Sequence, residues 1–269
     1  MRSEQEAFKV AVEAAEEAGR RLLRLSSSPK LSVKRKYDYP GSIVTNADIE
    51  SEKIILNRIK RSRIKSTVSS EEAGTVDFGS DEVVWAIDPL DGTFNFAKRI
   101  PHFAVSIGIL AHNKPMAGVI YNPVLDEMFT ASRSHGARLN GRKIHVSDAE
   151  ALRDSALIFE WWNPEPLIPD PPSFVKMLYG YTRNIRSPGS VALNLCSLAS
   201  GRFDGLLTVF QKAPIFEVAA GCVIAEEAGG CVTNSSGESW ESFSGSIVAG
   251  GAKVHGQLLS LIRERATVN

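Results

Sequence analysis

A β-prone run that ends in two carboxylates is the feature of this sequence that most constrains its fold. Residues 83–87 read Val-Val-Trp-Ala-Ile, and they lead directly into Asp88-Pro89-Leu90-Asp91-Gly92-Thr93. A short, continuous apolar run of this kind is typical of a strand that is buried on both faces. Because proline cannot continue a ladder and glycine permits a sharp turn, the strand should end here. The fold must therefore bring both carboxylates to the edge of a covered sheet.

The side chains of this segment suggest a site for a cation beside a site for an anion. Carboxylates and the backbone carbonyl of Leu90 are hard oxygen ligands, which suit Mg²⁺ or Mn²⁺ better than zinc. If a helix begins at Gly92 and Thr93, its free backbone N–H groups point to the same place and can bind phosphate oxygens.

Three other interpretations of the segment compete with a cation site. Asp, Pro and Gly are common turn residues, so the segment can be a turn and nothing more. Haloacid-dehalogenase phosphatases carry Asp-x-Asp-Gly-Thr, whereas two residues lie between Asp88 and Asp91 here. An EF-hand loop needs a glutamate at its twelfth position, and counting from Asp88 that residue is Arg99. The spacing excludes the last two interpretations and leaves the turn open.

The first half of the chain predicts helices followed by successive strands. Residues 4–25 have helical spacing, and Thr45-Asn46-Ala47-Asp48 offers N-capping side chains for a helix with Ile49, Leu56 and Ile59 facing inward. Strands are expected at residues 64–69, 83–87, 104–110, 117–122 and 127–131. Such a run of strands favours an antiparallel or mixed sheet with helices on its face.

The second half alternates between strands and helices, which indicates an α/β (α+β) fold overall. Strands are expected near 185–186 and at 205–209, 230–233 and 246–250, and helices at 190–200, 217–228 and 252–264. The proline-rich residues 161–172 should form an irregular excursion. We expect one domain at residues 1–148 and a second at 149–269.

Charge and cysteine content limit the classes of partner. Lys and Arg total 31, as do Asp and Glu, so the formal net charge is zero and nucleic acid is not an expected partner. Three cysteines without a CxxC pair indicate a reducing compartment, and we expect a cytoplasmic protein. No apolar run approaches membrane-spanning length, so no membrane partner is expected.

Five ordered motifs extend over nearly the whole chain. They are Val44-Thr45-Asn46-Ala47-Asp48, Ser70-Glu71-Glu72, residues 88–96, Arg186-Ser187-Pro188-Gly189-Ser190-Val191-Ala192, and Phe216-Glu217-Val218-Ala219-Ala220-Gly221 with Glu227-Ala228-Gly229-Gly230. In this order they resemble the inositol monophosphatase family, whose members are magnesium-dependent, often lithium-sensitive sugar and inositol phosphatases. The resemblance implies a layered αβαβα sandwich of two halves, a homodimer and hydrolysis by metal-activated water.

The resemblance also implies which residues hold the metal. The N-terminal half would carry most ligands, for two or three Mg²⁺ ions that Mn²⁺ can replace. The implied ligands are Glu71, Asp88, the Leu90 carbonyl, Asp91 and Glu217. Glu217 stands where the family has an aspartate, and it is one methylene longer.

The remaining site residues follow from the same motifs. Asp48, Thr93 and Glu71 would be catalytic, with Asp48 and Thr93 orienting or deprotonating the attacking water. The expected contacts to phosphate or substrate are Gly92, Thr93, Gly189, Ser190, Val191 and Lys212.

The substrate is less defined by the resemblance. Phe210 stands where inositol-selective animal enzymes have a glutamate, and Lys212 could meet a second phosphate or a sugar oxygen. The compact chain resembles the archaeal-type enzymes, which implies inositol-1-phosphate, fructose 1,6-bisphosphate or both. The alternatives are a 3′-phosphoadenosine 5′-phosphate or NADP(H) phosphatase, and a catalytically weak regulatory homologue. The resemblance implies that the basic run Lys34-Arg35-Lys36 could approach the active site and help to admit a doubly phosphorylated substrate, but we expect it to be solvated.

Overall fold

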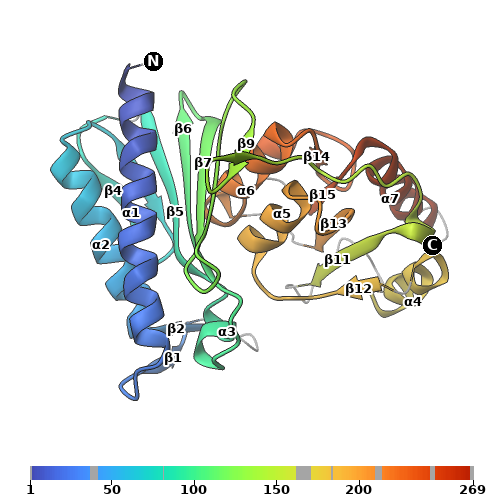
Figure 1. Cartoon of the computed structure of the whole chain (residues 1–269), viewed down its shortest axis with the longest axis horizontal. Helices are drawn as coiled ribbons and strands as arrows, with labels where there is room; N and C mark the ends of the chain where they lie inside the picture. Colours follow the sequence, from blue (N-terminus) through green and yellow to red (C-terminus); the bar gives the residue numbers. More distant parts are fainter. Residues whose placement is uncertain are drawn as a thin grey trace.

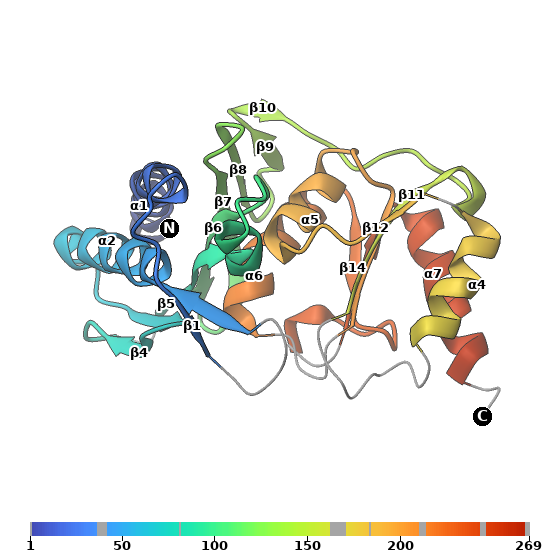
Figure 2. The same ribbon diagram turned by 90° about the horizontal axis from the view of Figure 1, so that it is seen from below.

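Two β-sheets and three layers of helices alternate through the molecule in the order helix, sheet, helix, sheet, helix (Figure 1). The view from below shows the same succession of layers (Figure 2). The computed structural model describes residues 2–36, 42–80, 82–161, 171–182, 184–209, 214–242 and 246–266. The predicted layered αβαβα architecture is confirmed.

The outer helical layer consists of α1 (Arg2–Ser26) and α2 (Asn46–Ser62), which cover one face of the first sheet. Small side chains line the buried face of α1, namely Ala7, Ala11, Ala14, Ala15 and Ala18. On α2, Ile55 and Ile59 are buried, whereas Ile49 is 37% exposed. The prediction that Ile49 faces inward is wrong, because six residues of helix turn it well away from Ile55.

The first sheet has eight strands in the order β10-β9-β8-β7-β6-β5-β3-β4. Their bounds are β3 (Thr67–Ser70), β4 (Gly74–Asp77), β5 (Val83–Asp91), β6 (Ala104–Ala111), β7 (Lys114–Asn122), β8 (Glu127–Ser132), β9 (Ala137–Leu139) and β10 (Arg142–Lys143). The central strand β5 pairs parallel to β3 and antiparallel to β6, so the sheet is mixed, which is one of the two predicted alternatives. A separate antiparallel pair, β1 (Val33–Arg35) and β2 (Ile43–Thr45), lies beside it.

The second sheet has five strands in the order β12-β11-β13-β15-β14. Their bounds are β11 (Ala156–Trp161), β12 (Asn184–Arg186), β13 (Gly205–Val209), β14 (Cys231–Thr233) and β15 (Ile247–Gly250). On its outer side lie α4 (Pro171–Tyr181) and α7 (Ala252–Ala266). Both β11 and α4 are missing from the sequence prediction. The helix begins at its prolines, which the first turn of a helix tolerates, and residues 162–170 of the predicted excursion lie outside the described residues.

The middle layer consists of α5 (Val191–Ala199) and α6 (Ile215–Glu227). Helix α6 packs on β5, β6 and β7 of the first sheet. A Cβ on Gly118 of β7 would lie 2.3 Å from the Ala220 carbonyl oxygen, so this close approach requires glycine. Helix α6 thus belongs to the second half of the chain but covers the sheet of the first half. The division into domains at residues 1–148 and 149–269 stays a prediction.

Short helical turns complete the described chain: α3 (Thr93–Ala97), η1 (Leu152–Asp154) and η2 (Trp240–Ser242). Within the described ranges, no helix has the length and apolar character that crossing a membrane requires.

Candidate active site

Strand β5 carries both carboxylates of the 88–93 segment, and it runs further than predicted, to Asp91. Its pairing with β6 is regular as far as Asp88, is interrupted, and resumes at Asp91. The interruption falls on Pro89 and Leu90, because proline has no N–H to donate to the ladder. Asp88 and Asp91 are 3% and 7% exposed. The irregularity therefore places two buried carboxylates at the end of the central strand.

Each of these carboxylates is oriented by local donors. The backbone N–H of Leu90 donates to Asp88 Oδ1 at 3.0 Å. Asp91 Oδ2 accepts the Ala192 N–H at 2.9 Å and also contacts the Ser190 hydroxyl. Since Ser190 is the N-cap of α5, the second half of the chain orients a carboxylate that the first half supplies.

Burial and neighbouring acidic charges raise the pKa of three carboxylates at this place. Burial raises the pKa of Asp88 well above its usual range, and the charges of Glu71, Asp91 and Glu217 raise it further. Burial also raises the pKa of Asp91 to about 6, although the Ser190 hydrogen bond opposes the change. For Glu217, burial followed by the charges of Glu71 and Asp91 raises the pKa to about 8. So much negative charge is costly without a counter-ion.

Lys36 supplies a positive charge at the edge of this cluster. Its Nζ lies 2.8 Å from Glu71 Oε1 and 2.7 Å from Glu72 Oε1. Burial alone would lower the pKa of Lys36, but the two glutamates outweigh burial and raise it. The prediction that Lys36 is solvated is wrong, because its side chain is 13% exposed and paired.

The donor set fits a hard divalent cation. The groups that raise one another's pKa here are all carboxylates, and oxygen is the ligand that Mg²⁺ prefers. Among the described residues, however, no three Asp, Glu, His or Cys side chains form a ready-made metal shell. Glu71 is turned toward Lys36, so closing a shell requires this side chain to change partners, whereas the Ser190 hydroxyl and the Ala192 N–H both contact Oδ2 of Asp91.

Asp48 and Thr93 form a second constellation beside the carboxylates. Asp48 is fully buried, and its Oδ2 accepts the N–H and the hydroxyl of Thr45, at 2.8 and 2.6 Å. Its other oxygen, Oδ1, accepts the Thr93 hydroxyl at 2.9 Å. That hydroxyl also lies 2.9 Å from the Leu90 carbonyl oxygen. Burial raises the pKa of Asp48 to about 6, against the opposing hydrogen bonds from Thr45.

The structure describes most of the other predicted contacts to phosphate or substrate, but not all of them. Gly92 and Gly189 adopt positive φ angles of 85° and 88°, which favour glycine. Ser190 and Val191 are buried at the start of α5. Lys212 lies outside the described residues, as does Phe210. The roles given to these residues stay predictions.

Two buried glutamates in this region escaped the sequence analysis. Glu52 accepts the Ser70 hydroxyl at 2.6 Å and the Ala73 N–H at 2.8 Å, and so holds the turn that carries Glu71. Glu160 holds the segment before α5. The only signal for Glu160 in the sequence is one acidic residue after the apolar run Ala-Leu-Ile-Phe.

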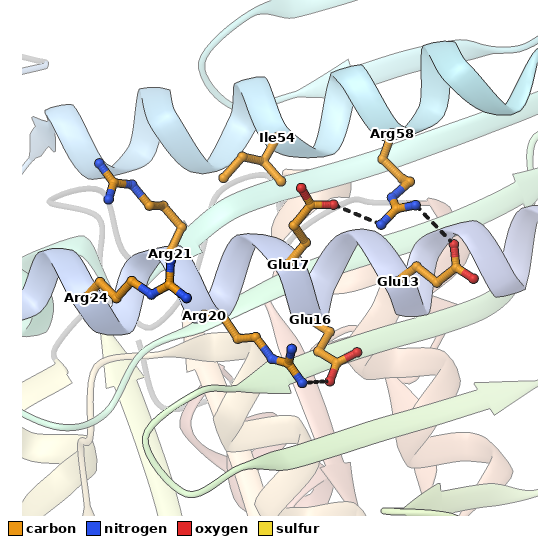
Figure 3. A pocket seen from close by; sticks show the side chains of 8 residues that line it. All are labelled: Glu13, Glu16, Glu17, Arg20, Arg21, Arg24, Ile54 and Arg58. Carbon is orange, nitrogen blue, oxygen red and sulfur yellow. Dashed lines mark hydrogen bonds and ion pairs between the residues drawn. The ribbon is translucent and has the colours of Figure 1, made fainter.

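A groove of about 470 Å³ between α1 and α2 lies away from these residues, on the outer helical layer (Figure 3). Arg58 lies 2.9 Å from Glu17 and 3.4 Å from Glu13, and Arg20 pairs with Glu16. The first sheet separates the groove from α5 and α6. It is a seam of ion pairs between two helices and contributes nothing to the candidate site.

Comparisons with known proteins place the chain among phosphatases and their relatives. The model of the inositol monophosphatase family matches residues 3–267. Nus factor SuhB of Escherichia coli (strain K12) is 34% identical over 256 residues, which are 95% of each chain. The structure of an inositol monophosphatase from Anabaena superposes with a TM-score of 0.83 and 32% identity, covering 97% of this chain and 96% of that one. The MJ0109 gene product, an inositol monophosphatase–fructose 1,6-bisphosphatase, gives a TM-score of 0.79 and 26% identity, covering 94% and 98%.

One prediction about partners is overturned by these findings. The curated relatives in Escherichia coli and Vibrio cholerae are named Nus factors, a name that belongs to transcription. The expectation that nucleic acid has no part among the partners is therefore wrong. A zero net charge sums over the whole chain, so it cannot exclude a local basic surface or recruitment through another protein.

The motifs that were separate in the sequence meet in the structure. The hydrogen-bond network converges on the 88–93 segment, where Thr93 donates to Asp48 at the start of α2 and Asp91 accepts from Ser190 at the start of α5. Together with the match over residues 3–267, this network shows that the chain belongs to the inositol monophosphatase family.

Proposed function

We propose that this chain is a Mg²⁺-dependent phosphomonoester hydrolase that releases phosphate from a small sugar or inositol phosphate. The proposed substrates are inositol-1-phosphate, fructose 1,6-bisphosphate or both. The observation that carries the proposal is the carboxylate cluster at the end of β5, where burial and neighbouring acidic charges raise the pKa of Asp88, Asp91 and Glu217. Both solved relatives named above as inositol monophosphatases support this substrate class.

The chain's own residues would hold the metal from both halves. The proposed ligands are Glu71, Asp88, the Leu90 carbonyl, Asp91 and Glu217. Bound Mg²⁺ would polarise the phosphate and stabilise charge on the attacking and leaving oxygens. Glu217 would join the cluster from the first turn of α6.

Thr93 and Asp48 are proposed to take a proton from the attacking water. The Thr93 hydroxyl has one proton to donate and two lone pairs that can accept. When it donates to Asp48, a lone pair is free to accept a water proton. The bonds from Thr45 fix Asp48 in place for this transfer, and the backbone N–H groups of Gly92 and Thr93 are left for phosphate oxygens.

Replacing Thr93 with valine is expected to lower kcat by about 10²-fold, because valine keeps the shape and removes the hydroxyl that links water to Asp48. KM should change little, since the backbone N–H groups stay in place. Steady-state kinetics with Mg²⁺ measure both constants, and Thr75→Val on the exposed strand β4 serves as the matched control. An unchanged kcat in Thr93→Val would rule out the proposed proton path.

Phosphate release from a substrate panel tests the proposed function. The panel contains inositol-1-phosphate, fructose 1,6-bisphosphate, 3′-phosphoadenosine 5′-phosphate and NADP, each with Mg²⁺ and with EDTA. We expect Mg²⁺-dependent turnover of one or both of the first two compounds. Selective turnover of 3′-phosphoadenosine 5′-phosphate or NADP would replace the proposed substrate class with that of the nucleotide phosphatases. If no compound is turned over, the result would support a catalytically weak regulatory homologue.

A second candidate function is a role in a transcription complex, which the Nus factor relatives favour. The end of α2 offers a basic surface for it: Lys60, Arg61, Arg63 and Lys65 are exposed, and none of them pairs with a carboxylate among the described residues. No acidic residue occurs between Glu52 and Glu71. RNA binding measured by anisotropy at increasing salt tests this candidate; it predicts binding that weakens with salt and with replacement of the four residues by glutamine.

A further inference from the structure

Glu160, near the end of β11, is a buried carboxylate that the proposed chemistry does not use. It is 3% exposed, and it accepts hydrogen bonds from three neutral donors. The Ser187 hydroxyl lies 2.7 Å from Oε2, and the Gly189 N–H lies 2.6 Å from Oε1. The Asn194 side-chain amide donates to Oε1 at 3.0 Å. All three donors belong to one continuous segment, the turn at residues 187–189 and the start of α5.

The topology of the second sheet explains why Glu160 meets this turn. Strand β12 pairs with β11 only as far as Arg186, opposite Ile158. Strand β11 continues to Trp161, paired with β13 on its other side. The chain that leaves β12 therefore passes beside the free edge of β11, where Glu160 stands.

A residue from the first half holds the same turn from the opposite side. The Asn95 side-chain amide donates to the Pro188 carbonyl at 2.8 Å and to the His102 carbonyl at 2.9 Å. A Cβ on Gly189 would lie 3.2 Å from that amide nitrogen, so there is little room for the turn to shift. Asn95 and Glu160 together clamp the turn between the two halves.

The residues that follow the clamped turn contact Asp91, a proposed metal ligand. Ser190 follows Gly189, and its hydroxyl and the Ala192 N–H both contact the Asp91 carboxylate. We propose that Glu160 is a positioning residue: by fixing the turn, it sets the donors that orient Asp91 and thereby sets the affinity for the divalent cation. The inference rests on the proposed function, since it assumes that Asp91 is a metal ligand. Partners that orient metal ligands commonly change metal affinity by about 10- to 100-fold.

Because all three donors are neutral, substitutions of Glu160 can separate the effect of its hydrogen-bond geometry from the effect of its charge. A glutamine at position 160 keeps an oxygen for Gly189 and Asn194, and its amide can donate to the Ser187 hydroxyl, which rotates to accept. Alanine removes every acceptor and leaves the Gly189 N–H without its partner. If position matters and charge does not, Glu160→Gln should resemble the wild type and Glu160→Ala should not.

The test compares Mn²⁺ affinity, measured by electron paramagnetic resonance, with amide hydrogen exchange of residues 187–192 in EDTA. Glu227→Ala is the matched control, because Glu227 also clamps a turn, through the N–H groups of Ser134, His135 and Gly136 at 2.9, 3.1 and 2.8 Å. We expect Glu160→Ala to weaken Mn²⁺ binding about 10-fold and to speed exchange in the turn. Glu160→Gln should stay within about twofold of the wild type, and Glu227→Ala should bind Mn²⁺ like the wild type.

The outcomes separate this inference from the proposed function. Wild-type Mn²⁺ affinity in Glu160→Ala would overturn the inference alone, as would equal weakening in Glu227→Ala. A wild-type protein that binds no Mn²⁺ would refute the proposed function and the inference together. If Glu160→Ala shows no cooperative melting transition, Glu160→Asp takes its place; it keeps the charge but is too short for all three donors, so weaker Mn²⁺ binding is again expected.

Discussion

Replacing Asp88 with asparagine is expected to reduce Mg²⁺-dependent phosphate release by about 10³-fold or more, and to stabilise the metal-free protein. Asparagine keeps the acceptor for the Leu90 N–H but removes a charge that the metal needs. The same charge is unfavourable without metal, because burial and then Glu71, Asp91 and Glu217 raise the pKa of Asp88. One substitution should therefore move activity and stability in opposite directions.

Phosphate release and thermal melting in EDTA measure the two effects on the same protein. Asp154→Asn is the matched control, since Asp154 is an exposed carboxylate on η1, far from β5. It should leave activity and melting temperature unchanged. Full Mg²⁺-dependent turnover in Asp88→Asn would refute the assignment of the site, whereas lower stability in EDTA would show that Asp88 is a structural residue.

Mg²⁺ is expected to stabilise the protein far more at pH 8 than at pH 5. Asp91 and Glu217 have pKa values of about 6 and about 8 in the folded protein, against ordinary values of 3.8 and 4.5. The folded state thus holds protons that the unfolded chain has released, so the stability of the metal-free protein should fall as pH rises from about 4 to about 8. A cation that neutralises the ionised groups reverses this loss.

Thermal melting across this pH range, with EDTA and with saturating Mg²⁺, measures the effect. At about 100 times its dissociation constant, Mg²⁺ contributes about 2.7 kcal/mol, which corresponds to several degrees for a chain of this size. At pH 5 protons compete for the carboxylates, and the shift should be small. An equal shift at both pH values would mean that Mg²⁺ acts elsewhere on the molecule. Asp88→Asn should lose most of the shift at pH 8.

Local patterns in the sequence predicted most of the fold, because they report burial directly. Strand β5 was predicted from five consecutive apolar residues, and α2 from the capping side chains at Thr45 and Asp48, which the structure shows as a capping box. Strand β11 has a similar apolar run, yet the prolines that follow it hid it. Ile49 was expected to face inward, but the buried face of α2 follows Ile55 and Ile59 instead.

Site residues could be predicted where they form a contiguous motif. They could not be predicted where they interact with residues that are distant in the sequence. The 88–93 segment showed both carboxylates at once. Lys36 and Glu160 act through partners that are 27 or more positions away in the sequence. Glu52 acts through Ser70 and Ala73, which are 18 and 21 positions away. No local spacing reveals such pairs, since they depend on which strand edges and turns the completed sheets bring together.

Anomalous scattering from a Mn²⁺-soaked crystal locates the bound cation. We expect anomalous peaks at the end of β5, within coordination distance of Asp88 and Asp91, with Glu217 turned toward one of them. We also expect Glu71 to leave Lys36 and join a ligand shell. Peaks confined to the groove between α1 and α2, or no peak beside Asp88 at saturating Mn²⁺, would contradict the proposed metal site.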